Sequence, residues 1–248
     1  MKNYIYAFFI TILAFCFFQC KGQTNNTNNT NDTNNTNENY TVQRGSPDGI
    51  GKFYKDREIA NVMGYQGINW LERPEREKEE NTGKLIQNLD IAPGENIADI
   101  GAGSGYHVFK MAPQVGQGLI YAVDIQPEML QNIRDRKKKE GIDNIEVVKG
   151  TETSVNLPEN SVDKILMVDV YHEFSFPVEM LSSMHKALRK DGKIYLIEYR
   201  GEDASVPIKK LHKMTEAQAV KEFKANGFVL QENINNLPWQ HCMVFVKK

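Results

Sequence analysis

A glycine-rich turn is the part of this chain that most directly indicates chemistry. Residues 97–109 read IADIGAGSGYHVF, in which Gly101, Gly103 and Gly105 follow a short apolar run. Glycine lets the backbone turn tightly and lets a ligand pack against bare main chain. When such a turn joins a parallel strand to a helix, it lies at the carboxyl end of the strand, where α/β proteins bind ligands. The turn therefore predicts a cofactor site.

The residues around the turn narrow the choice of cofactor. A dinucleotide fingerprint requires a third glycine where this chain has Tyr106, and that glycine permits close helix packing near a pyrophosphate. A phosphate-binding loop requires a lysine directly after the turn, and the first lysine here is Lys110. A nicotinamide-dependent oxidoreductase and a phosphate-cradling loop are therefore disfavoured.

The pattern D-x-G-x-G-x-G, which begins at Asp99, resembles the first motif of class I S-adenosylmethionine-dependent methyltransferases, and the similarity continues in order from about residue 83 to 246. The resemblance implies an α/β fold with a Rossmann-like, doubly wound, mostly parallel seven-stranded sheet and an antiparallel C-terminal strand. It implies that Asp124 holds both ribose hydroxyls, because a carboxylate only accepts hydrogen bonds. Many members carry an acid near adenine where this chain has Thr151. The predicted cofactor-binding residues are Asp99, Gly101, Gly103, Gly105, Asp124, Ile125, Thr151 and Asp169.

A polar segment, VDVYHEF at 168–174, would lie beside the glycine turn and supply acceptor-side residues. The protein must mainly align donor and acceptor, and a general base helps when the acceptor is a hydroxyl. His172 is a candidate base or acceptor-orienting group, unless it only packs on the loop. The other candidates are Tyr171, Glu198, which should point at the cleft, and His212 before the late helix. The segment lacks the [DN]-P-P-[YFW] pattern of enzymes that methylate nucleic-acid amino groups, which disfavours base methylation.

Residues 46–85 precede the predicted sheet and are expected to form a helical lid. The resemblance implies that this segment folds over the cofactor, with Trp70 and Arg73 available to line the acceptor pocket. A helical segment packed on the domain edge is the alternative. The run EREKEE at 75–80 is most simply a solvated helix face.

Strand-like and helix-like runs alternate from residue 97 onward, as in a parallel sheet covered on both faces. The predicted strands are 97–100, 119–123, 145–148, 164–168, 193–199 (after a turn at 191–192), 228–231 and 242–246. The predicted helices are 56–63, 75–89, 106–111, 127–139, 178–188 and 216–225. The link between the last two strands is too short for a crossover helix, so they must pair antiparallel. The methyltransferase domain is placed at 86–248.

The first 20 residues resemble a bacterial lipoprotein signal peptide. Residues 4–18 are apolar or weakly polar, a stretch too short for a membrane span and suited to a signal-peptide core. Cleavage before Cys20 would leave a lipid-carrying cysteine, although Gln19 replaces the usual small residue, and an uncleaved anchor or ordinary secretion stay open. The Asn/Thr-rich residues 21–45 predict a disordered tether. The expected location is the bacterial cell envelope, lipid-anchored on the periplasmic side or outer membrane, or the cytoplasm if the leader does not function.

The remaining composition argues against other partners. Thirty Lys and Arg against 32 Asp and Glu give a net charge of −2, so no nucleic-acid partner is expected. Cys242 is expected to be a buried free thiol, and no Cys/His cluster has zinc-ligand spacing, so no metal site is predicted. We expect a monomer that methylates a small molecule with S-adenosyl-L-methionine. The alternative is a membrane-tethered binding module without catalysis, because export would separate the protein from a cytoplasmic cofactor.

Overall fold

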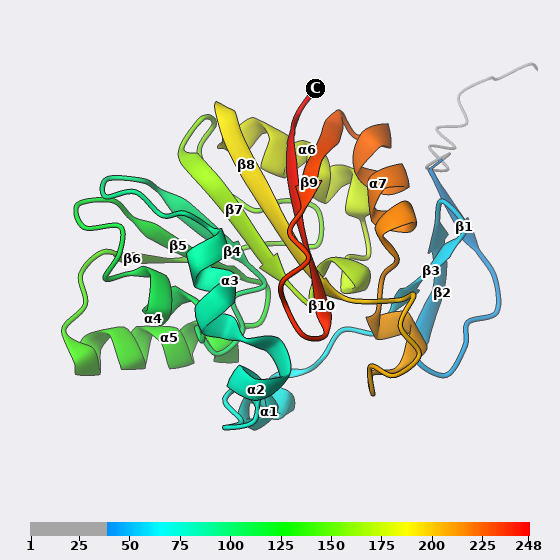
Figure 1. The fold of residues 1–248 in the computed structure, drawn as a ribbon, viewed down its shortest axis with the longest axis horizontal. Coiled ribbons are helices and arrows are strands. Elements are labelled where there is room, and N and C mark those ends of the chain that lie inside the picture. The colour runs from blue at the N-terminus through cyan, green and yellow to red at the C-terminus, as the bar shows by residue number, and fades with distance from the viewer. Residues whose placement is uncertain (1–38) are drawn as a thin grey trace, which may run out of the picture. The chain divides into compact units, whose positions relative to one another are not determined.

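The structure, a computed structural model, describes residues 39–248 (Figure 1). The predicted signal peptide, Cys20 and the tether as far as residue 38 lie outside the described residues. Among residues 39–248, no helix is long and apolar enough to cross a membrane.

A seven-stranded sheet in the order β6-β5-β4-β7-β8-β10-β9 is the core of the fold. Its strands are β4 (Ile97–Ile100), β5 (Ile120–Asp124), β6 (Ile145–Lys149), β7 (Val162–Val168), β8 (Leu188–Tyr199), β9 (Phe228–Asn233) and β10 (Gln240–Lys247). Strands β4 to β8 pair in parallel, whereas β10 pairs antiparallel with both β8 and β9. The predicted mostly parallel sheet with an antiparallel C-terminal strand is confirmed, except that β8 already includes the expected turn at 191–192.

Helices cover both faces of this sheet (Figure 1). They are α3 (Thr82–Asn88), α4 (Val108–Met111), α5 (Pro127–Glu140), α6 (Pro177–Ala187) and α7 (Glu216–Ala225). Local sequence sets their ends. Proline occupies the first turn of α5 and of α6, where its missing N–H costs nothing, and Gly141 ends α5 with a φ of 66°. Helix α7 begins where the Thr215 side chain accepts a hydrogen bond from the Gln218 amide at 3.1 Å.

Consecutive residues of the central strands face opposite cores. On β7, Ile165 belongs to the apolar cluster that includes Leu181 of α6 and Phe223 of α7. Its neighbour Leu166 belongs to the cluster on the other face, with residues of α3, α4 and α5. Because both faces are covered, the strands read as continuous apolar runs. Cys242 of β10 is a buried free thiol, as predicted.

The chain before the main sheet differs from the prediction. Strands β1 (Tyr40–Val42), β2 (Gly49–Tyr54) and β3 (Arg57–Ala60) form a separate three-stranded antiparallel sheet. The helix predicted at 56–63 is therefore wrong, and order begins before residue 45, the predicted end of the tether. Lys55 and Asp56 have positive φ angles of 49° and 74°, the backbone of a tight two-residue hairpin, which turns the chain back into a strand.

Short helical segments complete the fold. They are η1 (Tyr65–Gly67), α1 (Ile68–Leu71), α2 (Arg76–Glu80), η2 (Tyr171–Glu173) and η3 (Lys210–His212). The helix predicted at 75–89 is two helices, α2 and α3, because Asn81 adopts a left-handed conformation with a φ of 54° between them. The role of residues 46–85 as a lid stays a prediction, as do the domain boundaries.

Candidate functional site

A cavity of about 510 Å³ lies at the carboxyl ends of β4, β5, β7 and β8. Loops after these strands line it, together with residues near α1 and η3. Its volume lies within the range of pockets that enclose small organic ligands. The cavity is therefore where the predicted cofactor and acceptor residues can be compared with their observed positions.

The glycine turn forms one wall of the cavity through Gly101 and Gly103. Both have positive φ, and a Cβ atom on Gly103 would lie only 2.8 Å from Leu71 Cδ1. Gly105 does not line the cavity. A Cβ atom there would meet the Phe109 ring at 2.9 Å, so this glycine serves helix packing, and its contact with the cofactor stays a prediction.

Asp124, at the end of β5, is hydrogen-bonded to the glycine turn and faces the cavity. Its Oδ2 accepts a hydrogen bond from the Gly103 amide at 2.9 Å, and its Oδ1 accepts one from the Gln126 amide at 2.8 Å. Burial raises the pKa of Asp124, against the lowering effect of these amides. Each oxygen retains acceptor capacity for a ligand hydroxyl. Ile125 and Thr151 also line this part of the cavity, where the sequence placed the nucleoside.

Two other predicted carboxyl groups each have one buried oxygen without a hydrogen-bond partner. Asp169 lines the cavity: Gln240 donates to its Oδ2 at 2.7 Å, while its Oδ1 has no partner. Such an orphaned acceptor suits a ligand that brings a donor, such as an ammonium group. Asp99 is only 2% exposed, has an unpaired Oδ2 and, like Gly105, does not line the cavity.

A buried ionic group lies at the cavity wall and was not predicted from the sequence. Arg76 and Glu80 of α2 are 4% and 1% exposed, and their side chains pair at 2.7 Å. The Tyr199 hydroxyl donates to Glu80 at 2.9 Å, and all three residues line the cavity. The prediction of a solvated face at 75–80 is wrong for this edge of α2. The i,i+4 spacing of the pair and the strand-end tyrosine were the available signals.

The two candidates from the predicted lid separate. Trp70 lines the cavity, whereas Arg73 does not. The Arg73 guanidinium instead lies 3.0 Å from the centre of the Trp70 ring and pairs with Glu79 and Glu80. Arg73 therefore holds the Trp70 ring from behind.

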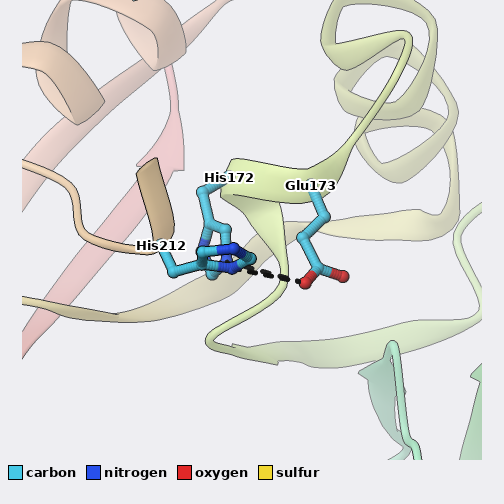
Figure 2. Close-up of side chains that lie close together, drawn as sticks. All are labelled: His172, Glu173 and His212. Carbon is cyan, nitrogen blue, oxygen red and sulfur yellow. Dashed lines mark hydrogen bonds and ion pairs between the residues drawn. The ribbon is translucent and has the colours of Figure 1, made fainter. Parts of the chain in front are cut away.

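Three side chains converge at another part of the cavity, as Figure 2 shows: His172 and Glu173 from η2, and His212 from η3. His172 Nε2 lies 3.2 Å from His212 Nδ1. Glu173 Oε1 lies 3.8 Å from the first atom and 3.7 Å from the second. Burial raises the pKa of Glu173 to about 7, and burial together with the neighbouring His172 lowers the pKa of His212.

Glu198 contacts His172 of this cluster without reaching the cavity. It is fully buried and does not line the cavity, so the expectation that it points at the cleft is corrected. Its Oε2 lies 2.7 Å from His172 Nδ1, and its Oε1 accepts the His172 amide at 3.2 Å. Burial alone would lower the pKa of His172, but the Glu198 carboxylate outweighs it and the pKa is raised. Glu198 is therefore a positioning residue.

Tyr171 is not part of the cavity, which corrects its prediction as a catalytic residue. It is fully buried, and its hydroxyl donates to Glu222 Oε2 at 2.8 Å. Successive residues of the tight η2 turn point different ways, so Tyr171 enters the core while His172 and Glu173 face the cavity. The approach of His212 to them depends on loops 40 positions apart, which residue spacing cannot reveal.

Comparison with known proteins gives a consistent result. A family model described as a methyltransferase domain matches residues 91–243. The chain is 24% identical over 164 residues to the uncharacterized methyltransferase YcgJ of Bacillus subtilis, a match that covers 65% of this chain and 64% of the relative. It is 27% identical over 146 residues to a protein-L-isoaspartate O-methyltransferase of Ignicoccus hospitalis, covering 58% of this chain and 66% of the relative. The matches thus span slightly less than two thirds of each relative.

A solved structure shows the same architecture. The crystal structure of a SAM-dependent methyltransferase from Aquifex aeolicus superposes with a TM-score of 0.70 at 23% identity, covering 74% of this chain and 98% of that one. At this identity, the likeness demonstrates a shared fold.

Proposed function

The chain belongs to the methyltransferase-domain family, and we propose that it transfers a methyl group from S-adenosylmethionine, the cofactor of this class I fold, to a small-molecule acceptor. One observation carries the proposal. The Asp124 carboxylate is fastened to the glycine turn at one side of a single cavity, and the His172, Glu173 and His212 side chains line the same cavity.

The residues of the cavity fit this cofactor. Asp124 offers acceptor oxygens to the two ribose hydroxyls, and Ile125 and Thr151 lie beside it for the base. The unpaired Asp169 Oδ1 suits the ammonium group of the methionine part, because a buried acceptor without a donor is costly. Gly103 leaves the wall of the turn free of side chain at this point.

The chemistry needs alignment more than activation. When bound, S-adenosylmethionine supplies a methyl group on a cationic sulfur, and transfer to an acceptor lone pair breaks the carbon–sulfur bond with its electrons left on sulfur. Trp70 and Leu71 line the cavity and help to exclude water. The acceptor gives up its proton to a basic atom among His172, Glu173 and His212, which suits a protic group such as a hydroxyl.

Calorimetry with the purified full-length chain tests the proposal. We expect one S-adenosylmethionine per chain, and we expect Asp124→Ala to lose most of the affinity because the ribose hydroxyls lose their acceptor. Asp143→Ala, which alters an exposed carboxylate, is the matched control and should bind as the parent does. Absence of binding by the parent chain would refute the proposal.

Label transfer then separates an enzyme from a binding module. Methyl-labelled S-adenosylmethionine, incubated with the protein and a small-molecule extract of the source cells, should yield labelled small molecules. Binding without transfer to this or to a protein fraction would favour the tethered binding module, and label found only in protein would overturn the small-molecule acceptor.

We further propose that the chain is lipid-anchored in the cell envelope through Cys20. The support is the leader itself: a short positive start, an apolar run at 4–18 and a cysteine followed at once by polar residues. More than one acyl chain would hold the protein stably at a membrane.

A further inference from the structure

We propose that His172, Glu173 and His212 form a binding site for a divalent transition-metal ion, with Zn²⁺ the best match, at the acceptor side of the cavity. The statement that the site lies beside a methyl acceptor, and the acceptor class inferred below, rest on the proposed function. The site itself stands on the geometry of the three side chains (Figure 2). It reverses the expectation from sequence spacing, which predicted no metal site.

The distances between the ligand atoms match a tetrahedral ion. The three atoms are separated by 3.2, 3.7 and 3.8 Å. With bonds of about 2.1 Å, a tetrahedral ion has ligand–ligand edges of roughly 3.4 Å and an octahedral ion has edges of roughly 3.0 Å. The observed separations lie nearer the larger value, and two of the three exceed it, so small side-chain movements would close the cluster around a tetrahedral ion.

The hydrogen bond between His172 and Glu198 fixes which nitrogen of the neutral His172 ring is free to bind a metal. The Glu198 carboxylate accepts a hydrogen bond at His172 Nδ1, so the proton lies on that nitrogen in the neutral ring and the lone pair lies on Nε2. A carboxylate behind a ligating histidine orients the ring and strengthens it as a ligand. Nε2 is the atom that faces His212 and Glu173.

Charge at the cluster also favours a dication. Glu198 and Glu173 bring two carboxyl groups to a largely buried region, and the Arg57 guanidinium beside it is already paired with Glu222. Arg57 reaches the cluster only through the His172 carbonyl oxygen, to which it donates at 3.1 Å. A divalent ion held by two neutral imidazoles would balance both carboxylates.

Three protein ligands leave a fourth position on the cavity side, the arrangement of catalytic rather than structural zinc sites. The His212 side chain is 24% exposed, so the ion has a path from solvent. The fourth position would take an oxygen of the acceptor, and the second carboxylate oxygen of Glu173, which does not ligate the ion, is left to take the acceptor's proton. The class of acceptor that this implies is a small molecule with a hydroxyl or carboxyl group, because such oxygens ligate zinc.

The test is zinc binding by the purified full-length chain, prepared without a histidine tag and freed of metal by a chelator. We expect one Zn²⁺ per chain by calorimetry and elemental analysis, and no binding of Mg²⁺, which prefers oxygen ligands. His212→Ala and Glu173→Gln should each weaken zinc binding by more than about 100-fold, because each removes a ligand. Glu198→Gln should weaken it by about 10–100-fold through the orientation of His172.

His241→Ala is the matched control. His241 is also largely buried and paired with a carboxylate, Glu202, at 2.9 Å, but it lies outside the cluster and should leave zinc binding unchanged. Circular dichroism and S-adenosylmethionine binding on the same preparations keep the readouts independent of folding and of the proposed function. If cofactor binding is intact while the parent binds no zinc, or binds it as tightly as the folded His212→Ala and Glu173→Gln variants do, the cluster is a hydrogen-bonded histidine pair and the metal proposal is wrong.

Discussion

Asp99, the residue before the last of β4, has an almost fully buried carboxyl group. Burial raises its pKa from about 3.8 to about 7, with a smaller raising effect from Asp124 and an opposing effect from Arg76. A carboxyl group whose pKa is higher in the folded than in the unfolded chain stabilises the fold only while it is protonated. Its contribution is complete below about pH 4 and is lost as the pH rises towards 7.

Asp99→Asn should therefore stabilise the protein without cofactor at alkaline pH. We expect the two proteins to unfold with similar free energies near pH 4, and the variant to be more stable at pH 8 by up to about 4 kcal/mol, the equivalent of the pKa shift. Urea denaturation at both pH values measures the difference. The exposed Asp143→Asn is the control, and an equal pH response of Asp99→Asn and the parent would contradict the prediction.

The residues predicted for the nucleoside could be placed at the cavity from the sequence, and those predicted for the acceptor only partly. Asp124 and Gly103 follow strands at fixed distances along the chain, so local pattern was enough to place both at the cavity. Tyr171 and Glu198 were assigned to the cleft because they follow strand ends. The backbone conformation of a tight turn or of a strand end decides whether such a side chain faces solvent or core. The sequence does not show that conformation.

The contact between β3 and α7 depends on one buried ion pair. The Arg57 guanidinium binds Glu222 at 2.7 and 2.9 Å, and Glu222 is fully buried. The turn before β3 is also joined to α7 at the surface, where Lys221 pairs with the exposed Asp56. The buried pair should matter far more, because without Arg57 the buried Glu222 carboxylate keeps only the neutral Tyr171 and Gln218 donors and has no cation to offset its desolvation cost.

Arg57→Met should destabilise the protein by about 3–5 kcal/mol, the usual cost of removing one partner of a buried pair. Lys221→Met, the matched change at the surface, should alter the unfolding free energy far less, since exposed pairs are screened by water and salt. Chemical denaturation of both variants gives the comparison. Similar losses in the two variants would mean that the buried pair does not hold the small sheet to α7.

Helix α7 shows where local sequence is enough to predict an element, and strand β3 shows where it is not. The bounds of α7 were predicted correctly, because Thr215 caps its start and Asn226 and Gly227 end it. Strand β3 was predicted as helix because its turn, Lys55 and Asp56, lacks the glycine that usually marks a two-residue hairpin. The pairing of β3 with β2 and the ion pair to α7 are long-range interactions, and they outweigh local preference.

At the scale of the whole molecule, location decides which molecules the protein can meet. Residues 1–20 predict export and lipid attachment, whereas the fold binds a metabolite made in the cytoplasm. Cys20→Ala tests the anchor: cells fed a labelled fatty acid should label the parent chain but not the variant, and the variant should leave the membrane fraction. Cys242→Ala, a change at the buried thiol, should leave label and location as in the parent. Unchanged labelling and location in Cys20→Ala would contradict the anchor.

The position of β10 has a consequence for the order of events in the cell. This strand lies between β8 and β9, although it follows both in the sequence, so the sheet is incomplete until residues 240–247 have been synthesised. A nascent chain that lacks β10 exposes two open strand edges and cannot close its core. The seven-stranded sheet is therefore completed only by its last strand in the sequence, whatever part of it forms earlier.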